Sequence, residues 1–144
     1  MKSLIAPALV LCLTLPAAAQ EINFGTNASD YARDGECDDR RFVGEGMAAS
    51  LEGESLGADA ADCEALFNEG KIKLWDINAA REATMCNAIE FGNDTNDFAQ
   101  DGECDDPRFE GFESALSLLA DDAGTDATDC RKLCEFGRIF LRNY

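Results

Sequence analysis

The chain has 144 residues, of which 29 are acidic and 12 are basic, and its formal net charge of −17 comes with no histidine at all. So acidic a protein is not expected to bind nucleic acid or an anionic membrane, and cations or basic proteins remain as partners. The lack of histidine excludes Ser-His-Asp and Cys-His catalysis and histidine-ligated zinc.

Residues 1–19 have the layout of a secretory signal. Lys2 precedes an apolar run from Leu4 to Leu15, and small residues follow Pro16, as at a signal cleavage site. The apolar run is too short to span a bilayer, and no later segment approaches that length. We therefore predict an exported protein, periplasmic or extracellular, without a membrane span. A lipoprotein attached through Cys12 is the alternative.

The rest of the chain is an internal duplication. When the sequence is shifted by 67 residues, 22–74 align with 89–141 without a gap, and 26 of the 53 positions are identical. Such extended identity at a single offset indicates a repeated structural unit. We divide the mature chain into copy 1 at 20–74, a connector at 75–88 that holds the only tryptophan, and copy 2 at 89–144.

Each copy shows the same order of local patterns. Ile22 and Phe24, or Ile89 and Phe91, predict a short first strand, and an acidic loop around a cysteine follows. Helical spacing then appears in Phe112, Ala115, Leu116 and Leu119, and more weakly between Met47 and Leu51.

A second helix is expected to start at Asp59 or Asp126 and to end before Gly70 or Gly137, because glycine commonly follows a helix end. Each copy ends in Gly-x-Ile-x-Leu, which predicts a last strand. We expect this last strand to meet the first strand of its own copy. The fold class is therefore a small, disulfide-rich α+β fold. Its two tandem copies (short strand, acidic loop, two short helices, short strand) would pack as one body, with Trp75 at their seam.

Six cysteines follow the signal, and an even number in an exported chain predicts disulfides. The duplication limits their pairing, because Cys37 and Cys63 recur as Cys104 and Cys130. We predict one bridge within each copy and a third bridge between the two cysteines that have no counterpart, Cys86 and Cys134. A copy of 53 residues is close to the size at which a hydrophobic core alone is marginal, so such bridges are expected.

The acidic loops predict a cation site in each copy. Calcium takes six to eight oxygen ligands, mostly carboxylates and carbonyls, and the predicted bridges bring acids from two chain segments together. The spacing differs from that of an EF-hand, since Ala99 and Arg108 would occupy ligand positions. The candidate ligands are six aspartates of each copy: Asp30, Asp34, Asp38, Asp39, Asp59 and Asp62, and Asp97, Asp101, Asp105, Asp106, Asp126 and Asp129.

Two families share these motifs. Gly-x-Cys-Asp followed by Asp-x-x-Asp-Cys, at 35–38 with 59–63 and at 102–105 with 126–130, resembles the calcium-binding half of Notch-type repeats. The resemblance implies that carboxylates of both segments surround the ion beside a disulfide. The Asp-Gly-Glu-Cys-Asp-Asp-Pro-Arg-Phe and Asp-Ala-Thr-Asp-Cys motifs of copy 2 resemble a family of secreted bacterial repeats that are sometimes attached to peptidases. That resemblance implies an accessory or binding module.

The same aspartates also fit a fold without any metal. Asp59 and Asp62 could cap the second helix, and Asp38 or Asp39 could pair with Arg41. In that case the protein would be a metal-free disulfide module that binds a basic or secreted protein or regulates a protease. A small hydrolase with Glu36 and Asp39 as its carboxylate pair is the remote alternative. We expect a non-enzymatic protein. The sequence does not indicate an oligomeric state.

Overall fold

The computed structural model describes residues 21–144, so the predicted signal segment lies outside the described residues. Within this range, three short α-helices and six three-residue strands form a small α+β fold, as predicted. In chain order, the elements are β1 (Phe42–Gly44), β2 (Ser50–Glu52), η1 (Gly53–Ser55), α1 (Ala60–Asn68), β3 (Ile72–Leu74), α2 (Ile77–Ala83), η2 (Cys86–Ala88), β4 (Phe109–Gly111), β5 (Ser117–Leu119), η3 (Ala120–Asp122), α3 (Ala127–Glu135) and β6 (Ile139–Leu141). No described helix is long and apolar enough to cross a membrane.

The predicted last strand of each copy is present, but its partner was predicted wrongly. β3 pairs antiparallel with β1, and β6 pairs in the same way with β4. Ile22 and Phe24 form no strand. Phe24 instead stacks on Phe42 of β1, with ring centroids 5.5 Å apart, so the first segment contributes a core side chain and no strand hydrogen bonds. Its alternating apolar residues, Ile22 and Phe24, are both half-buried and pack against that core.

The first predicted helix of each copy is also wrong, because the residues concerned pair across the molecule. β2 and β5 form an antiparallel ladder in which Leu51 lies opposite Leu118. Both leucines are buried and pack together with Ala115, whereas Phe112 and Leu116, which helical spacing placed on the same face, are 71% and 77% exposed. This long-range strand pairing outweighs the local helical pattern.

The second predicted helix is confirmed in both copies as α1 and α3. The chain leaves each helix through a glycine with positive φ, 73° at Gly70 and 68° at Gly137, a conformation that costs glycine little. Each helix receives a cap from the segment before the acidic loop. Asn27 Oδ1 accepts the Ala61 N–H at 2.7 Å, and Asp94 Oδ1 accepts the Thr128 N–H at 2.7 Å.

All three predicted disulfides are present: Cys37–Cys63, Cys104–Cys130 and Cys86–Cys134. The first two lie inside the cores of the two halves, where they pack with Phe42 and Ile72 or with Phe109 and Ile139. The third joins η2 of the connector to α3. Each of the first two bridges joins cysteines 26 residues apart. In the chain-entropy model, a bridge across a loop of this length stabilises the fold by about 3.5 kcal/mol.

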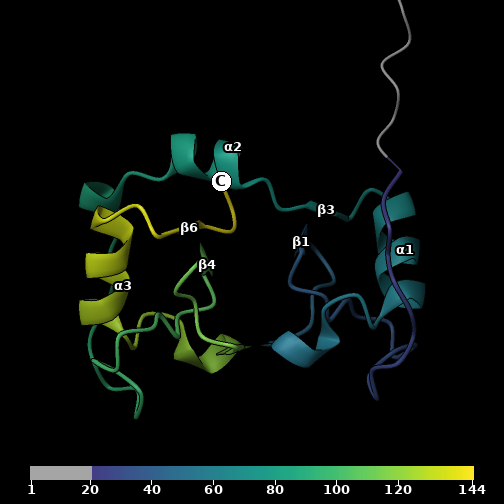
Figure 1. Ribbon diagram of the computed structural model, residues 1–144, viewed down its shortest axis with the longest axis horizontal. Coiled ribbons are helices and arrows are strands. Elements are labelled where there is room, and N and C mark those ends of the chain that lie inside the picture. The colour runs from purple at the N-terminus through teal and green to yellow at the C-terminus, as the bar shows by residue number, and fades with distance from the viewer. Residues whose placement is uncertain (1–20) are drawn as a thin grey trace, which may run out of the picture.

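The two halves meet through the β2–β5 ladder and through a buried ion-pair network. In Figure 1 α1 and α3 lie at opposite ends of the long axis, and α2 lies beside β6. Glu110 accepts hydrogen bonds from Arg40 at 2.8 Å and from Arg142 at 2.6 Å, and both arginines are less than a tenth exposed. Trp75 donates its indole N–H to the Leu141 carbonyl across the same joint at 3.2 Å.

Candidate metal centre

In each half a disulfide holds the acidic loop against the first turn of a helix. Cys37 of the loop is bonded to Cys63 of α1, and the two Cα atoms are only 4.7 Å apart. The corresponding Cys104 and Cys130 have Cα atoms 4.8 Å apart. The aspartates that flank these cysteines therefore meet, although about 20 residues of chain separate Asp38 from Asp59.

Backbone N–H groups of the loop bind the two helix aspartates. Asp59 Oδ2 accepts the N–H of Asp38 at 2.9 Å, and Asp62 Oδ2 accepts the N–H of Gly35 at 3.1 Å. Asp34 turns back on the loop and accepts the N–H of Glu36 at 3.0 Å. These bonds fix one oxygen of each carboxylate and leave the second oxygen free for another partner.

Copy 2 repeats this geometry. Asp126 Oδ2 accepts the N–H of Asp105 at 2.9 Å, and Asp129 Oδ2 accepts the N–H of Gly102 at 2.8 Å. The turn of Asp34 recurs at Asp101, whose Oδ1 lies 2.9 Å from the backbone nitrogen of Glu103. The same arrangement is thus built twice, by two copies that are identical at 26 of 53 aligned positions overall and nearly identical within the site.

The most informative atoms are the buried carboxylate oxygens that have no donor. Asp59 is fully buried and Asp38 is 5% exposed, yet Asp59 Oδ1 and Asp38 Oδ2 accept no hydrogen bond from the described residues. In copy 2, Asp126 Oδ1 and Asp105 Oδ2 are in the same situation. Buried carboxylate oxygens are normally hydrogen-bonded, because loss of hydration without a replacement is unfavourable. Because the oxygens without a donor are equivalent atoms in the two copies, both sites need the same additional partner for these oxygens.

The pKa values of the site also show that its carboxylates are buried close to one another without enough compensating positive charge. Burial, followed by the charge of Asp34, raises the pKa of Asp38 to about 6. Burial and the charge of Asp101 raise the pKa of Asp105 to about 6. Burial also raises the pKa of Asp59, although the hydrogen bond from the Asp38 N–H opposes this. At neutral pH each site therefore holds like charges that repel each other and lack full hydration.

Asp39 and Asp106 each bind an arginine, so we do not include them in the proposed set of metal ligands. Asp39 accepts from Nε of Arg41 at 2.8 Å and from the N–H of Gly57 at 2.8 Å, and it is fully buried. Asp106 makes the same bonds with Arg108 and the N–H of Gly124. The ion pair that the sequence allowed for either adjacent aspartate is thus made by the second one alone.

Asp30 and Asp97 have less support as ligands. Both are exposed, and neither is among the charges that raise the pKa of Asp38 or Asp105. Glu36 and Glu103, which were not predicted as ligands, do contribute such charge. The signal for them was their place in Asp-Gly-Glu-Cys-Asp-Asp, which occurs at both 34–39 and 101–106. The acids that the structure brings together are Asp34, Asp38, Asp59 and Asp62 with Glu36, and Asp101, Asp105, Asp126 and Asp129 with Asp122 and Glu103.

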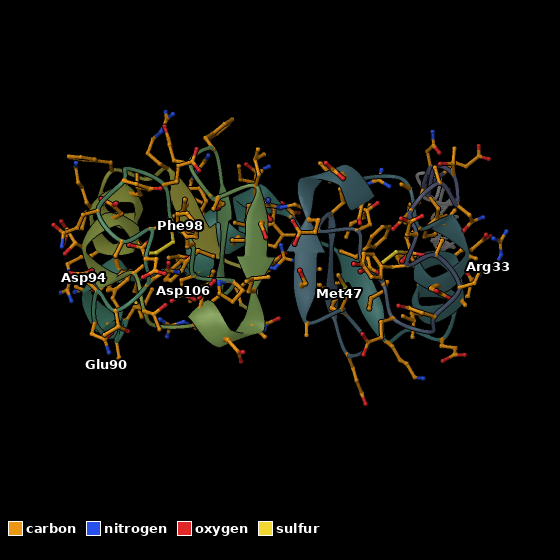
Figure 2. The ribbon with its side chains drawn as sticks, turned by 90° about the horizontal axis from the view of Figure 1, so that it is seen from below. Arg33, Met47, Glu90, Asp94, Phe98 and Asp106 are labelled. Carbon is orange, nitrogen blue, oxygen red and sulfur yellow. A yellow bond between two sulfur atoms is a disulfide. The ribbon has the colours of Figure 1, made fainter. Side chains whose placement is uncertain are left out.

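Helix capping does not explain the aspartates that begin α1 and α3. Asp59 occupies the N-cap position, but its side chain makes no capping hydrogen bond, and the same is true of Asp126. Asn27 and Asp94 provide the side-chain caps instead. Figure 2 shows Asp94 at the outer end of its half and Asp106 further inside. The carboxylates of Asp59 and Asp126 are therefore directed into the acidic cluster for another reason.

The sulfur atoms beside the carboxylates do not add metal ligands. Cys37, Asp59 and Cys63 bring potential ligand atoms within 4.8 Å of one another, as do Cys104, Asp126 and Cys130. A metal-binding cysteine must be a thiolate, whereas these four cysteines are disulfide-bonded. The side-chain ligands of the site are thus carboxylate oxygens, which hard cations prefer.

Comparison with models of protein families, with curated proteins and with solved structures finds no match to this chain. The residues and the geometry of the site are therefore the basis for inferring its function.

Proposed function

We propose that the protein is an exported, non-enzymatic module of two packed copies, each of which binds one calcium ion. The buried pair Asp38 and Asp59, with its counterpart Asp105 and Asp126, carries this proposal. Each member of the pair has a buried oxygen without a donor. A divalent cation would bind these oxygens and compensate the repulsion between their charges.

The ligand chemistry favours calcium over other divalent cations. All available side-chain ligands are carboxylates, and they come from a loop and a helix that a disulfide holds together. Magnesium demands near-ideal octahedral geometry and keeps several waters, whereas calcium accepts a larger and less regular set of oxygens. The resemblance to Notch-type repeats, whose carboxylates lie beside a disulfide, supports the same cation.

A carboxylate hydrolase has less support. The pair considered for it, Glu36 and Asp39, would need two carboxyl groups that reach a substrate. Asp39 is fully buried and bonded to Arg41. We therefore propose a structural or protein-binding accessory, such as one that acts beside a secreted peptidase.

Calorimetric titration of the oxidised protein with calcium tests the proposal. We expect a stoichiometry near two, and at about 100 times Kd each bound ion should stabilise the fold by roughly 2.7 kcal/mol. Asp34→Asn and Asp101→Asn should each weaken one site and leave the other intact. These aspartates are exposed, so the variants should fold.

Asp121→Asn is the matched control, since Asp121 is an exposed aspartate of η3 outside both clusters. It removes the same charge and should leave both sites unchanged. Absence of calcium binding at millimolar concentration would refute the proposal, and so would equal loss of affinity in the control.

A further inference from the structure

Two grooves flank the joint between the halves, at positions that the repeat makes equivalent. The larger, which we call the seam groove, has a volume of about 540 Å³ and is lined by Leu56, Leu74, Trp75, Phe112 and Leu116, among others. The smaller, which we call the twin groove, has a volume of about 250 Å³ and includes Ala49, Pro107 and Arg142. A shift of 67 residues converts most of one lining into the other.

The side chains of the two grooves differ where they are most exposed. Trp75, Phe112 and Leu116 of the seam groove correspond to Arg142, Glu45 and Ala49 on the other side. Leu56 likewise corresponds to Ala123. The seam side of the joint thus has large exposed apolar residues at positions where the twin side has Glu45, Ala49 and Ala123, although buried or half-buried apolar residues such as Met47 and Leu118 line the twin groove too. The twin groove serves as an internal comparison, because its side of the joint forms without large exposed apolar residues at those positions.

The apolar residues of the seam groove remain open to solvent. Phe112 is 71% exposed, Leu116 is 77% exposed, and Leu56 is 48% exposed. Side chains this exposed contribute little to the core, which is formed at the joint by Leu51, Ala115 and Leu118. A contiguous exposed apolar surface commonly marks a site that another molecule covers.

The negative charge of the protein favours a basic partner for the seam groove. Glu54 and Asp76, both exposed, directly follow the lining residues Gly53 and Trp75. The nearby arginines are all engaged by acids: Arg41 is paired with Asp39, and Arg40 shares Glu110 with Arg142. Arg138, whose guanidinium lies over the Phe112 ring, is paired with Glu113. With a chain charge of −17, a second copy of the protein would be repelled, whereas a basic partner would be attracted.

We propose that the seam groove binds a polypeptide segment with an apolar centre and flanking lysine or arginine residues. The apolar centre covers Phe112 and Leu116 beside Trp75, and the flanking basic residues face the exposed acids Glu54 and Asp76. Apolar contact provides affinity, and the opposite charge speeds association and selects against acidic partners. This site is separate from the acidic clusters and requires no metal.

Trp75 gives a direct readout, because it is the only tryptophan of the chain and lines the groove. The probe is a synthetic peptide of four leucines flanked by two lysines on each side, titrated in the presence of a chelator. We expect saturable change in Trp75 emission. Phe112→Ser should weaken binding about tenfold or more. Phe136→Ser is the matched control, since Phe136 is equally exposed, at 70%, but lies outside the groove.

Three results would overturn the proposal. The first is equal affinity of the Phe112→Ser and Phe136→Ser variants, which would mean that binding is a general effect of charge. The second is equally tight binding of the peptide in which glutamates replace the lysines. The third is a dimer of the wild-type protein in sedimentation that Phe112→Ser dissociates, because the groove would then be covered by a second copy.

Discussion

Leu51 pairs with Leu118, its own counterpart in the repeat, at the centre of the β2–β5 ladder. On either side, Ser50 lies opposite Leu119 and Glu52 opposite Ser117, so the two copies contribute the same three positions in reversed order. This is the register of an isologous contact, in which one surface meets an equivalent surface. The joint of the molecule therefore has approximate two-fold symmetry at its centre and differs at its edges.

The buried aspartates should have opposite effects on stability with and without calcium. Asp38→Asn removes a charge that is buried beside Asp59, so we expect the calcium-free variant to unfold at a higher temperature than the wild type. The gain should be on the order of 1 kcal/mol, the repulsion of two charges about 4 Å apart in water, or somewhat more in a shielded site. The same variant should lose calcium binding in its half. Calorimetric melting with chelator and with calcium measures both effects.

Asp105→Asn should behave in the same way in copy 2, and the double variant should add the two effects, because the sites lie in separate halves. A calcium-free Asp38→Asn protein that melts below the wild type would contradict the expected repulsion.

The stability of the calcium-free protein should depend on pH through the same pair. The folded pKa of Asp38 is about 6, above its ordinary value of 3.8, so the folded state binds the proton more tightly. This contribution to stability is complete below about pH 4 and is lost as pH rises through 6. We expect the wild type to lose stability relative to the Asp38→Asn and Asp105→Asn double variant between pH 4 and pH 7. Urea unfolding of both proteins in chelator measures this difference.

Calcium should compete with those protons. Its affinity should therefore fall as the pH is lowered from 7 to 5, and calcium should remove the pH dependence when it saturates the sites. A calcium affinity that is constant over this interval would argue that the buried pair does not bind the ion.

Glu110 should be among the most sensitive positions at the joint. Glu110→Ala leaves Arg40 and Arg142 buried together without a carboxylate, and each repels the other. Burial and the charge of Arg40 already lower the pKa of Arg142 in the wild type. Removal of one member of a buried ion pair costs about 3–5 kcal/mol. Glu113→Ala removes a solvent-screened pair with Arg138 and should cost far less than Glu110→Ala. Urea unfolding compares the two, and equal losses would refute the role of the network.

The sequence was most informative where local chemistry and the repeat agree. The disulfides could be predicted because Cys37 and Cys63 recur and Cys86 and Cys134 do not. The helices α1 and α3 could be predicted because an aspartate precedes each and a glycine follows it. These features depend on the chain close to each residue or on a comparison within the chain.

Features that depend on distant residues could not be predicted in this way. The ladder between β2 and β5 is formed by residues 65 to 69 positions apart, and nothing in the spacing of Leu116 or Leu118 distinguishes it from a helix. The adjacent Asp38 and Asp39 have the same chemistry, and only the position of Arg41 decides which one is neutralised. The ion-pair network uses Arg40 and Glu110 where the other copy has Pro107 and Val43, so the repeat itself concealed it.

The self-paired register of β2 and β5 has a further consequence for how the contact depends on dilution. Two separate chains that joined through such a ladder would dissociate as their concentration fell. Here the connector at 75–88 keeps both strands in one molecule, and the Cys86–Cys134 bridge fastens the connector to the second half. The strands therefore meet at a fixed effective concentration, which is typically millimolar for a short link. The ladder between the halves forms equally well however dilute the protein becomes.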